Sequence, residues 1–374
     1  MSKKILAITQ CYHCGSWLCI KRILDKLSDL GNEIMVLGLD TRPNKNKNIK
    51  YISIPYFAYN RFGYVTCKNP VFGFLWYLPL FISGLILTFA YRPKVIIFNG
   101  LTSGLIMAPL MKLLGRKTIV MYHGYIGNYG AKTKRILKIL GKFVDMVVVN
   151  SQGSYDDILT VVEASKIIIN NHFADDLFFD KFKEKEDKGK TLNVLYVGRI
   201  DKDKWVFPLM EIAKKLREDK QFIFNFVGKG GDVNKVKKLA KLSSNAFYLG
   251  YITDRLKLKK LYQEADILWS FADTTYLALP AVEALACATP IMISKYAAIT
   301  GKQEVLNKEL VPSKIGWIFD PLDLDKTYKL LLKIKDNREA TKKRKAALAH
   351  ARKYYSGKNL METVKIINGL IGKK

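Results

Sequence analysis

Short hydrophobic runs alternate with amphipathic stretches along most of the chain. Runs without polar interruption, such as V-I-I-F and M-V-V-V, are typical of parallel strands covered on both faces by helices. The first half therefore predicts a doubly wound α/β domain. Its expected strands are Ile5–Ile8, Ile34–Leu39, Val95–Phe98, Lys117–Tyr122, Met146–Asn150 and Ile167–Asn170, and its expected helices are Ser16–Leu30, Gly104–Leu114 and Lys134–Phe143.

A charged segment separates this half from a second β/α series. Residues 175–190 mix acidic and basic side chains without core periodicity, which predicts a surface linker between domains at 1–174 and 191–355. Two doubly wound halves predict a ligand cleft between them, at the carboxyl ends of the strands. The expected strands are Leu192–Val197, Phe222–Val227, Ala246–Tyr248, Ile267–Trp269 and Ile291–Ile293, with helices at Trp205–Glu218, Val233–Ser243, Leu256–Ala265, Pro280–Ala286, Asn337–Tyr355 and Asn359–Leu370.

One uncharged stretch, residues 71–90, is long enough to match a bilayer as a helix. Three interpretations stay open: a spanning helix, a core helix of a soluble domain, and a monotopic helix whose Trp76, Tyr77 and Phe81 enter the membrane interface. The glycines and proline inside the stretch, and the buried strand predicted directly after it, weigh against a span. We expect a membrane-associating segment.

The net charge of +29 comes from 62 basic and 33 acidic residues and is spread over both halves. Such a field attracts anionic lipid, phosphorylated ligands or nucleic acid. We expect no nucleic-acid partner, because aromatic and basic residues do not interleave in a known reading motif. Five cysteines, an odd number, indicate a reducing compartment, and no secretory pattern opens the chain. We therefore expect a cytoplasmic protein, peripheral on the inner face of the cell membrane.

Several motifs have a plain explanation. Cys11-x-x-Cys14, with His13 and Cys19 nearby, lacks the second pair that a zinc site requires, so we expect no metal. The D-K-D at 201–203 is most simply a surface turn. The K-K-R-K at 342–345 is most simply a solvated helix face, and His172 and His350 are expected to be structural or exposed.

The loops after the strands of the second half carry the candidate chemistry. Gly198 permits a sharp turn, and Arg199 and Lys204 follow it as candidate ligands of one anion. The glycine-rich turn at 228–232 allows close approach of a flat base. Tyr251 follows the next strand and is placed to border a ring. The loop after the fourth strand runs into a helix N-terminus suited to phosphate, and Glu283 on that helix could accept two ribose hydroxyls. In this order and at strand ends, these loops predict a nucleotide-diphosphate site.

These motifs resemble those of the retaining GT-B glycosyltransferases of family four. The matching segments are V-G-R-I-D-K-D-K at 197–204, V-G-K-G at 227–230, F-Y-L-G-Y-I-T-D at 247–254 and L-P-A-V-E-A-L-A-C-A-T-P at 279–290, together with V-M-Y-H-G at 120–124, V-V-N-S at 148–151, W-I-F-D-P-L-D at 317–323 and Y-Y-S-G-K-N at 354–359. The resemblance covers nearly the whole chain. It implies two Rossmann-like domains and a last helix, 356–374, that crosses back to the first.

The resemblance also implies roles for individual residues. Arg199 and Lys204 would bind the donor diphosphate and stabilise the leaving group, and His123 would touch the donor sugar. Backbone N–H groups of Ala278 and Leu279 would assist. The remaining implied donor-binding positions are Gly15, Gly198, Gly228, Tyr251, Ile252, Thr275 and Glu283.

The sequence departs from the family at the sugar end of this site. Thr275 occupies the place of the first glutamate of the family's E-x7-E pair, and Trp205 replaces the glycine after the lysine. The expected function is metal-independent, cofactor-free retaining transfer of a hexose from a nucleotide sugar to a lipid-linked or cell-surface glycan acceptor. The alternatives are a catalytically impaired homologue acting as a binding or partner subunit, a GT-B epimerase and, on charge alone, a nucleic-acid-binding protein.

Overall fold

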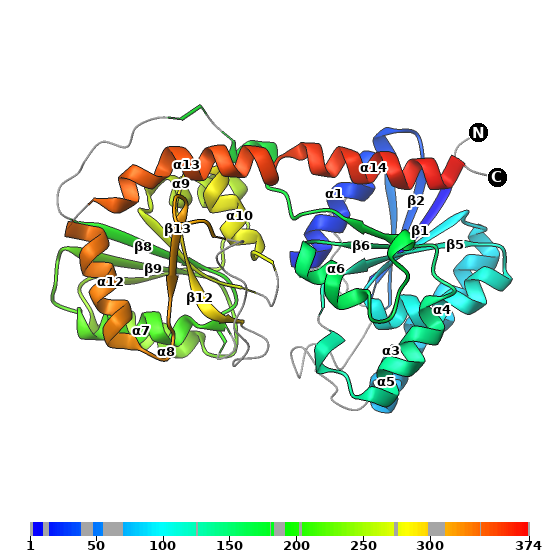
Figure 1. Ribbon diagram of the computed structural model, residues 1–374, viewed down its shortest axis with the longest axis horizontal. Helices are drawn as coiled ribbons and strands as arrows, with labels where there is room; N and C mark the ends of the chain where they lie inside the picture. The colour runs from blue at the N-terminus through cyan, green and yellow to red at the C-terminus, as the bar shows by residue number, and fades with distance from the viewer. Residues whose placement is uncertain are drawn as a thin grey trace. The chain divides into compact units, whose positions relative to one another are not determined.

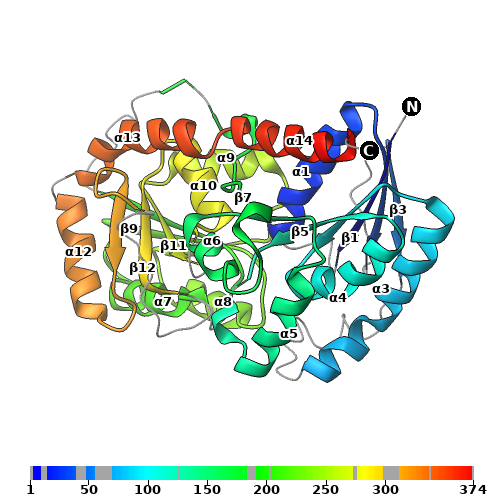
Figure 2. The same cartoon turned by 45° about the vertical axis from the view of Figure 1, so that its right-hand side comes forward.

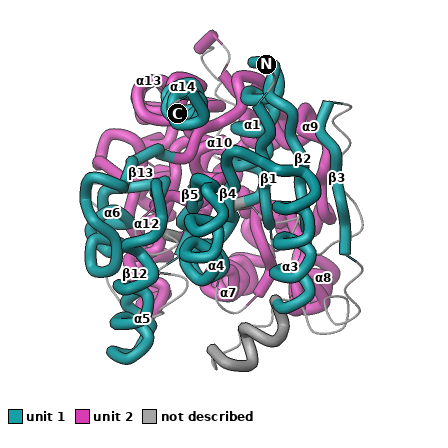
Figure 3. Tube along the Cα trace, turned by 90° about the vertical axis from the view of Figure 1, so that its right-hand side faces the viewer, with its two compact units in different colours: residues 1–171, 360–374 teal, residues 172–359 magenta. Residues whose placement is uncertain are grey.

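The computed structural model describes residues 3–9, 15–38, 48–54, 70–124, 126–179, 181–182, 191–201, 204–272, 276–297, 311–336 and 338–372. These residues form two compact units, coloured separately in Figure 3. Unit 1 comprises residues 1–171 and 360–374, and unit 2 comprises residues 172–359. Each unit is built on an all-parallel sheet with helices on both faces (Figure 1), which confirms the predicted α/β class.

Unit 1 contains a seven-stranded sheet in the order β3-β2-β1-β4-β5-β6-β7. Two separate clusters of buried side chains lie on its two faces. Helices α3, α4, α5 and α6 cover one face, and α1 and the C-terminal part of α14 cover the other. The elements are β1 (Lys4–Thr9), α1 (Gly15–Asp29), β2 (Glu33–Gly38), β3 (Ile49–Ser53), α3 (Pro70–Tyr91), β4 (Val95–Asn99), α4 (Leu101–Leu113), β5 (Lys117–Tyr122), η1 (Ile126–Asn128), α5 (Ala131–Gly141), β6 (Met146–Val149), α6 (Gln152–Ile158), η2 (Ala164–Lys166), β7 (Ile167–Ile169) and α14 (Gly357–Gly372).

Unit 2 contains a six-stranded sheet in the order β10-β9-β8-β11-β12-β13. Helices α9, α10 and α13 pack on one face, and α7, α8 and α12 pack on the other. The elements are η3 (Asp176–Phe178), β8 (Leu192–Val197), α7 (Val206–Lys215), β9 (Phe222–Val227), α8 (Val233–Leu242), β10 (Ala246–Gly250), α9 (Arg255–Glu264), β11 (Ile267–Ala272), α10 (Leu279–Ala286), β12 (Ile291–Ala297), β13 (Gly316–Phe319), α12 (Leu324–Asp336) and α13 (Glu339–Tyr354).

Helix α3 contains the uncharged stretch and packs closely on the sheet. A Cβ at Gly84 would lie 2.9 Å from the Ile8 Cδ1 atom, so glycine at this position lets the helix approach β1. Phe81 is buried in the core, so its predicted place in a membrane interface is wrong, whereas the Trp76 and Tyr77 side chains lie outside the described residues. In the part of the chain that the structure describes, no helix is long and apolar enough to cross a bilayer.

The K-K-R-K segment is not a uniformly solvated face. Arg344 is buried, and its guanidinium donates to the carbonyl oxygens of Ala265 and Gln263 at 3.0 and 3.2 Å. These carbonyls lie at the C-terminal end of α9, where they have no partner within the helix. Arg344 therefore ties α13 to α9, and the sequence prediction was wrong for this residue.

Candidate functional site

The strand order of unit 2 points to one edge of its sheet. The order reverses between β8 and β11, because the chain runs outward from β8 to β10 and returns to β11 on the other side of β8. Open α/β sheets bind ligands outside the carboxyl ends of the strands at such a point. Arg199 and Lys204 follow β8, and Glu283 lies on α10, which follows β11. These predicted site residues therefore lie on the elements that flank the switch point.

The glycines after β8 and β9 hold two turns in backbone contact. A Cβ at Gly228, whose φ is 148°, would lie 1.8 Å from the carbonyl oxygen of Gly198, and one at Gly230 would lie 2.4 Å from that of Ile200. The backbone N–H of Ile200 donates to the Lys229 carbonyl at 3.0 Å. The V-G-K-G motif therefore has a structural reason of its own, besides the predicted approach of a base.

Arg199 lies on this paired turn with its guanidinium partly exposed. Its Nη1 atom is 2.7 Å from the Asp201 Oδ2 atom, and the other oxygen of Asp201 accepts from the Gly231 backbone N–H at 2.7 Å. Asp201 thus joins the arginine to the second turn, in agreement with a surface turn. The remaining acidic residue of the D-K-D sequence, Asp203, lies outside the described residues.

Lys204 is buried, with only 8% of its surface exposed, and its ammonium lies 4.6 Å from the centre of the Phe271 ring. The next residue, Trp205, has a φ of 49°, in the left-handed region that favours glycine. This backbone geometry fits the glycine that the family has here. The Trp205 indole donates to the Tyr296 carbonyl at 3.1 Å, and the Trp205 carbonyl accepts from the Trp269 indole at 3.0 Å. Trp205 therefore holds the ends of β11 and β12 beside the lysine.

Glu283 is 2% exposed and is held by two donors. The Arg255 Nη2 atom lies 2.7 Å from Oε1, and the Tyr262 hydroxyl donates to Oε2 at 3.2 Å. Burial and the neighbouring carboxylate raise the pKa of Tyr262 well above its usual range, so the hydroxyl stays protonated and donates. Arg255 also stacks 4.5 Å above the centre of the Phe178 ring.

Sequence reasoning missed both partners of Glu283. The structure begins α9 at Arg255, after Asp254 as its N-cap, whereas the sequence analysis began this helix at Leu256. No local sequence pattern pairs a residue on α9 with one on α10. The loop before α10 has a further support in His172, whose Nδ1 lies 3.2 Å from the Leu277 carbonyl and whose ring meets the Tyr276 ring edge-on. His172 is thus structural, as predicted.

The expected base-bordering residues follow β10. Tyr251 is exposed, and the Lys229 ammonium lies 4.6 Å from the centre of its ring. Ile252 is half-buried. Ala278 caps α10 in an extended conformation, and Leu279 is the first residue of that helix. Thr275 lies outside the described residues.

Two predicted residues belong to unit 1. His123 directly follows β5, and Gly15 is the first residue of α1. The sheet order of unit 1 also reverses, between β1 and β4, and the ends of these strands are joined by a hydrogen bond of 2.9 Å from the Asn99 amide to the Thr9 hydroxyl. Cys11, His13 and Cys14 lie outside the described residues.

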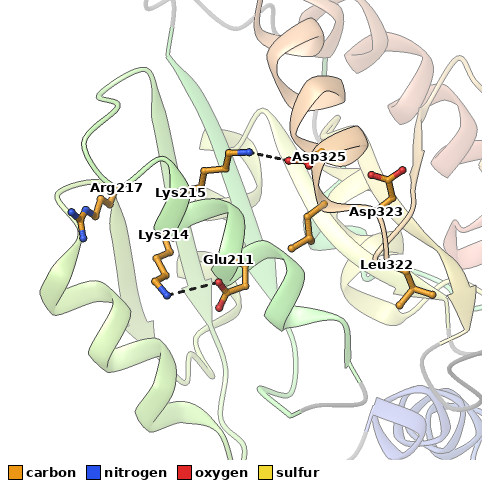
Figure 4. Close-up of a pocket in the computed structure, with 8 residues that line it drawn as sticks. Glu211, Lys214, Lys215, Arg217, Leu322, Asp323 and Asp325 are labelled. Carbon is orange, nitrogen blue, oxygen red and sulfur yellow. Dashed lines mark hydrogen bonds and ion pairs between the residues drawn. The ribbon is translucent and has the colours of Figure 1, made fainter.

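No group of three or more His, Cys, Asp or Glu side chains that could hold a metal occurs among the described residues. A surface depression of about 890 Å³ lies in unit 2 between the C-terminal part of α7 and the start of α12 (Figure 4). Its charged side chains neutralise one another, as in the 2.9 Å ion pair of Lys215 with Asp325. It contains none of the predicted site residues.

The chain matches the model of the glycosyl transferases group 1 family over residues 178–354 and that of glycosyltransferase family 4 over residues 15–175. It is 26% identical over 208 residues to an uncharacterised 41.2 kDa protein from the cps region of Klebsiella pneumoniae. That match covers 50% of this chain and 56% of the Klebsiella protein, so the chain spans just over half the length of this relative.

Solved structures share the fold at low identity. The sucrose-phosphate synthase of Thermosynechococcus elongatus superposes with a TM-score of 0.75 at 16% identity, covering 99% of each chain. A glycosyltransferase of Rickettsia africae gives 0.74 at 18%, covering 100% of each chain. The Anabaena protein HepE in complex with UDP gives 0.72 at 16%, covering 98% of this chain and 99% of HepE. With both family models matched in succession on a two-sheet GT-B fold, the chain belongs to the group 1 glycosyltransferases.

Proposed function

We propose that the protein transfers a sugar from a nucleotide-sugar donor that binds at the switch point of unit 2. The observation that carries this proposal is the burial of opposite charges on the elements beside it. Lys, Arg, Asp and Glu are rarely buried without a specific role. Among the described residues only Lys204, Glu283 and Arg344 of these types are buried, and Arg344 is occupied in joining two helices.

The proposed roles follow the chemistry of the departing diphosphate. Arg199 and Lys204 stabilise its charge, since guanidinium and ammonium groups bind phosphate oxygens and preorganised charges act most strongly where water is excluded. The N-terminus of α10, at Ala278 and Leu279, adds backbone donors. Glu283 accepts the ribose hydroxyls, and Gly198 and Gly228 leave room for the donor.

We propose a retaining reaction without metal. The bond from the sugar's anomeric carbon to the diphosphate breaks through an oxocarbenium-like transition state, and the acceptor oxygen bonds to the same face of the sugar. The acceptor's proton passes to the departing phosphate. His123 contacts the donor sugar, while Tyr251 and Ile252 border the base, Gly15 leaves space near the first loop, and Thr275 stands where the family has a sugar-contacting glutamate. The complexes of HepE with UDP and with UDP-glucose support a nucleotide-sugar donor.

The proposed acceptor is a lipid-linked or cell-surface glycan, and the proposed location is the inner face of the cell membrane. The fold is shared with WaaG, a glycosyltransferase involved in lipopolysaccharide biosynthesis, at a TM-score of 0.70 and 13% identity, and this likeness supports a glycan acceptor. Incubation of the protein with candidate nucleotide sugars and a membrane extract tests this. With a radiolabelled sugar on the donor, the label should enter the lipid or glycan fraction. Incorporation of the label only into water-soluble products would contradict the proposed acceptor.

Calorimetry with UDP, GDP and ADP tests the donor site. We expect one of them to bind, and Arg199→Ala and Lys204→Ala each to abolish the binding. Lys214→Ala and Arg217→Ala remove cations that line the surface depression, and as matched controls they should leave nucleotide binding unchanged. Absence of binding to all three nucleotides would overturn the proposal.

A second candidate function is a catalytically impaired homologue that acts as a binding or partner subunit, which the threonine at position 275 favours. Turnover separates the two candidates. A protein that binds the nucleotide but neither transfers sugar to any fraction of the membrane extract nor hydrolyses the donor would favour the subunit.

A further inference from the structure

Three neighbouring helices of unit 1, α3, α4 and α5, cover one face of its sheet. Helix α4 packs against both α3 and α5, and Figures 2 and 3 show α4 beside α3. Each of the three precedes a parallel strand and follows the carboxyl edge of the sheet, so the helices run in the same direction. We call the outer sides of these three helices, which point away from the sheet, the α3–α5 face.

The α3–α5 face exposes large apolar side chains in rows. On α3 they recur at helical spacing along one side, and α5 and its C-terminal end repeat the pattern. Isolated exposed apolar residues are ordinary, but rows on adjacent helices mark a contact surface. The exposed residues are Leu78, Ile82, Ile86 and Phe89 from α3, Leu110 and Leu113 from α4, and Ile136, Ile139 and Phe143 from α5 and the residues after it.

The same stretch of chain carries one sign of charge. Residues 70–144 contain ten lysines and arginines and no aspartate or glutamate. The exposed cations stand among the apolar residues: Lys112 precedes Leu113, and Arg135, Lys138 and Lys142 accompany Ile136, Ile139 and Phe143.

Helix α5 shows the arrangement most clearly. Ile136, Ile139 and Phe143 recur at spacings of three and four, which places them on one side of the helix. The opposite side is fixed to the domain, since Leu137 is buried and a Cβ at Gly141 would lie 2.1 Å from the Val161 carbonyl oxygen. The exposed row is therefore held outward on a firmly packed helix.

We propose that the α3–α5 face docks on the surface of an anionic lipid bilayer. Apolar side chains enter the interface between head groups and acyl chains, and the cations beside them attract anionic head groups. A second copy of the chain fits less well, because the same face would meet it with only positive charge. Nucleic acid attracts the cations but offers no apolar medium for the rows of isoleucine, leucine and phenylalanine.

This inference concerns a surface of unit 1 and is tested without donor or turnover, so its failure is distinct from failure of the proposed transferase activity. The first measurement is co-sedimentation of the full-length protein with vesicles of pure phosphatidylcholine and of phosphatidylcholine with 30% phosphatidylglycerol. We expect binding to the anionic vesicles at low salt that weakens as salt is added.

The charge variant combines Arg135→Gln, Lys138→Gln and Lys142→Gln, all at exposed positions of α5 or just after it. Each cation near an anionic surface strengthens binding about fivefold, so the partition coefficient should fall on the order of a hundredfold. The matched control removes three exposed lysines from α8 in unit 2 and should fall far less. These are Lys237, Lys238 and Lys241.

The apolar variant combines Ile136→Gln with Ile139→Gln, which are 58% and 60% exposed. Its control combines Leu242→Gln with Leu256→Gln in unit 2, at 65% and 64%. Net charge is the same in both, so a selective loss of vesicle binding by the first identifies apolar insertion.

Three results would overturn the proposal. They are equal binding to neutral and anionic vesicles, equal losses in the α5 variants and their controls, and vesicle binding absent while the α5 cations still govern binding to a DNA duplex. Circular dichroism confirms that each variant is folded before its binding is compared.

Discussion

The ion pair of Arg255 with Glu283 makes a strong prediction about stability, because one partner is almost fully buried. Arg255→Met keeps most of the side-chain length but removes the 2.7 Å contact to the carboxylate and the stacking on Phe178. Removing one partner of a fully buried pair costs about 3–5 kcal/mol. Since the Arg255 side chain is 30% exposed, we expect a smaller loss of about 2–3 kcal/mol in the free energy of unfolding.

A double-mutant cycle separates the pair from its surroundings. Glu283→Gln keeps the side-chain shape and an acceptor for the Tyr262 hydroxyl, so we expect it alone to cost about 1 kcal/mol. Arg255→Met together with Glu283→Gln leaves no buried charge, and its cost should be about 2 kcal/mol below the sum of the single changes.

Urea unfolding followed by tryptophan fluorescence measures these energies, since three of the five tryptophans lie in unit 2. Arg217→Met is the control, because Arg217 pairs at 3.4 Å with an exposed neighbour, Glu218, and should change stability by less than about 0.5 kcal/mol. The reasoning is refuted if Arg255→Met is as mild as the control, or if the two single costs simply add.

Three further predictions concern backbone strain and pH. Gly228→Ala should lower the free energy of unfolding in urea by at least about 3 kcal/mol and abolish nucleotide binding, because its Cβ would clash with the Gly198 carbonyl oxygen. Gly231→Ala is the control and should be tolerated, because its Cβ would lie 3.4 Å from its nearest neighbour. Trp205→Gly removes the strain of a non-glycine residue in the left-handed region, about 1 kcal/mol, but it also removes the packed indole. We therefore expect a net fall in melting temperature on thermal unfolding, and a rise would contradict the packing role. Burial, then nearby lysines, lower the pKa of His350 to about 4, so the folded protein binds this proton more weakly than the unfolded chain, and stability is lost as the pH falls from about 6.5 to 4. His350→Gln should lose about 1 kcal/mol less over that window, allowing for the partial exposure of the ring, and parallel pH profiles would refute this.

Hydrophobic periodicity predicted most of the fold, since long apolar strands and amphipathic helices can be identified from the local sequence pattern. The sequence prediction omitted β3, β13, α6 and α12 as elements. The alternating I-K-Y-I-S of β3 and the capping Asp323, which accepts from the Lys326 N–H at 2.9 Å at the start of α12, were the available signals. β3 is short and lies at the edge of its sheet. β13 is also short, and its pairing with β12, which the local sequence does not show, identifies it as a strand.

In the candidate site, too, local sequence placed the residues at strand ends but not the contacts that depend on helix packing. Glycines, the basic pair and Glu283 could be placed at strand ends because the carboxyl ends of parallel strands share one edge. The contacts that hold Glu283 could not be placed, because Arg255 and Tyr262 reach it through the packing of α9 on α10. Likewise Arg344 reads as one more cation in a basic helix until its position against α9 is known.

The backbone contact between Gly198 and Gly228 has a consequence for how such a protein can be altered. Two connections that are 30 residues apart in the chain behave as one rigid part, since neither can move or lengthen without displacing the other. Loop exchange at a single connection is therefore expected to fail here. If the proposed nucleotide binds here, a change of base preference is more readily reached by substituting exposed side chains on these turns, such as Lys229, or by exchanging both connections together.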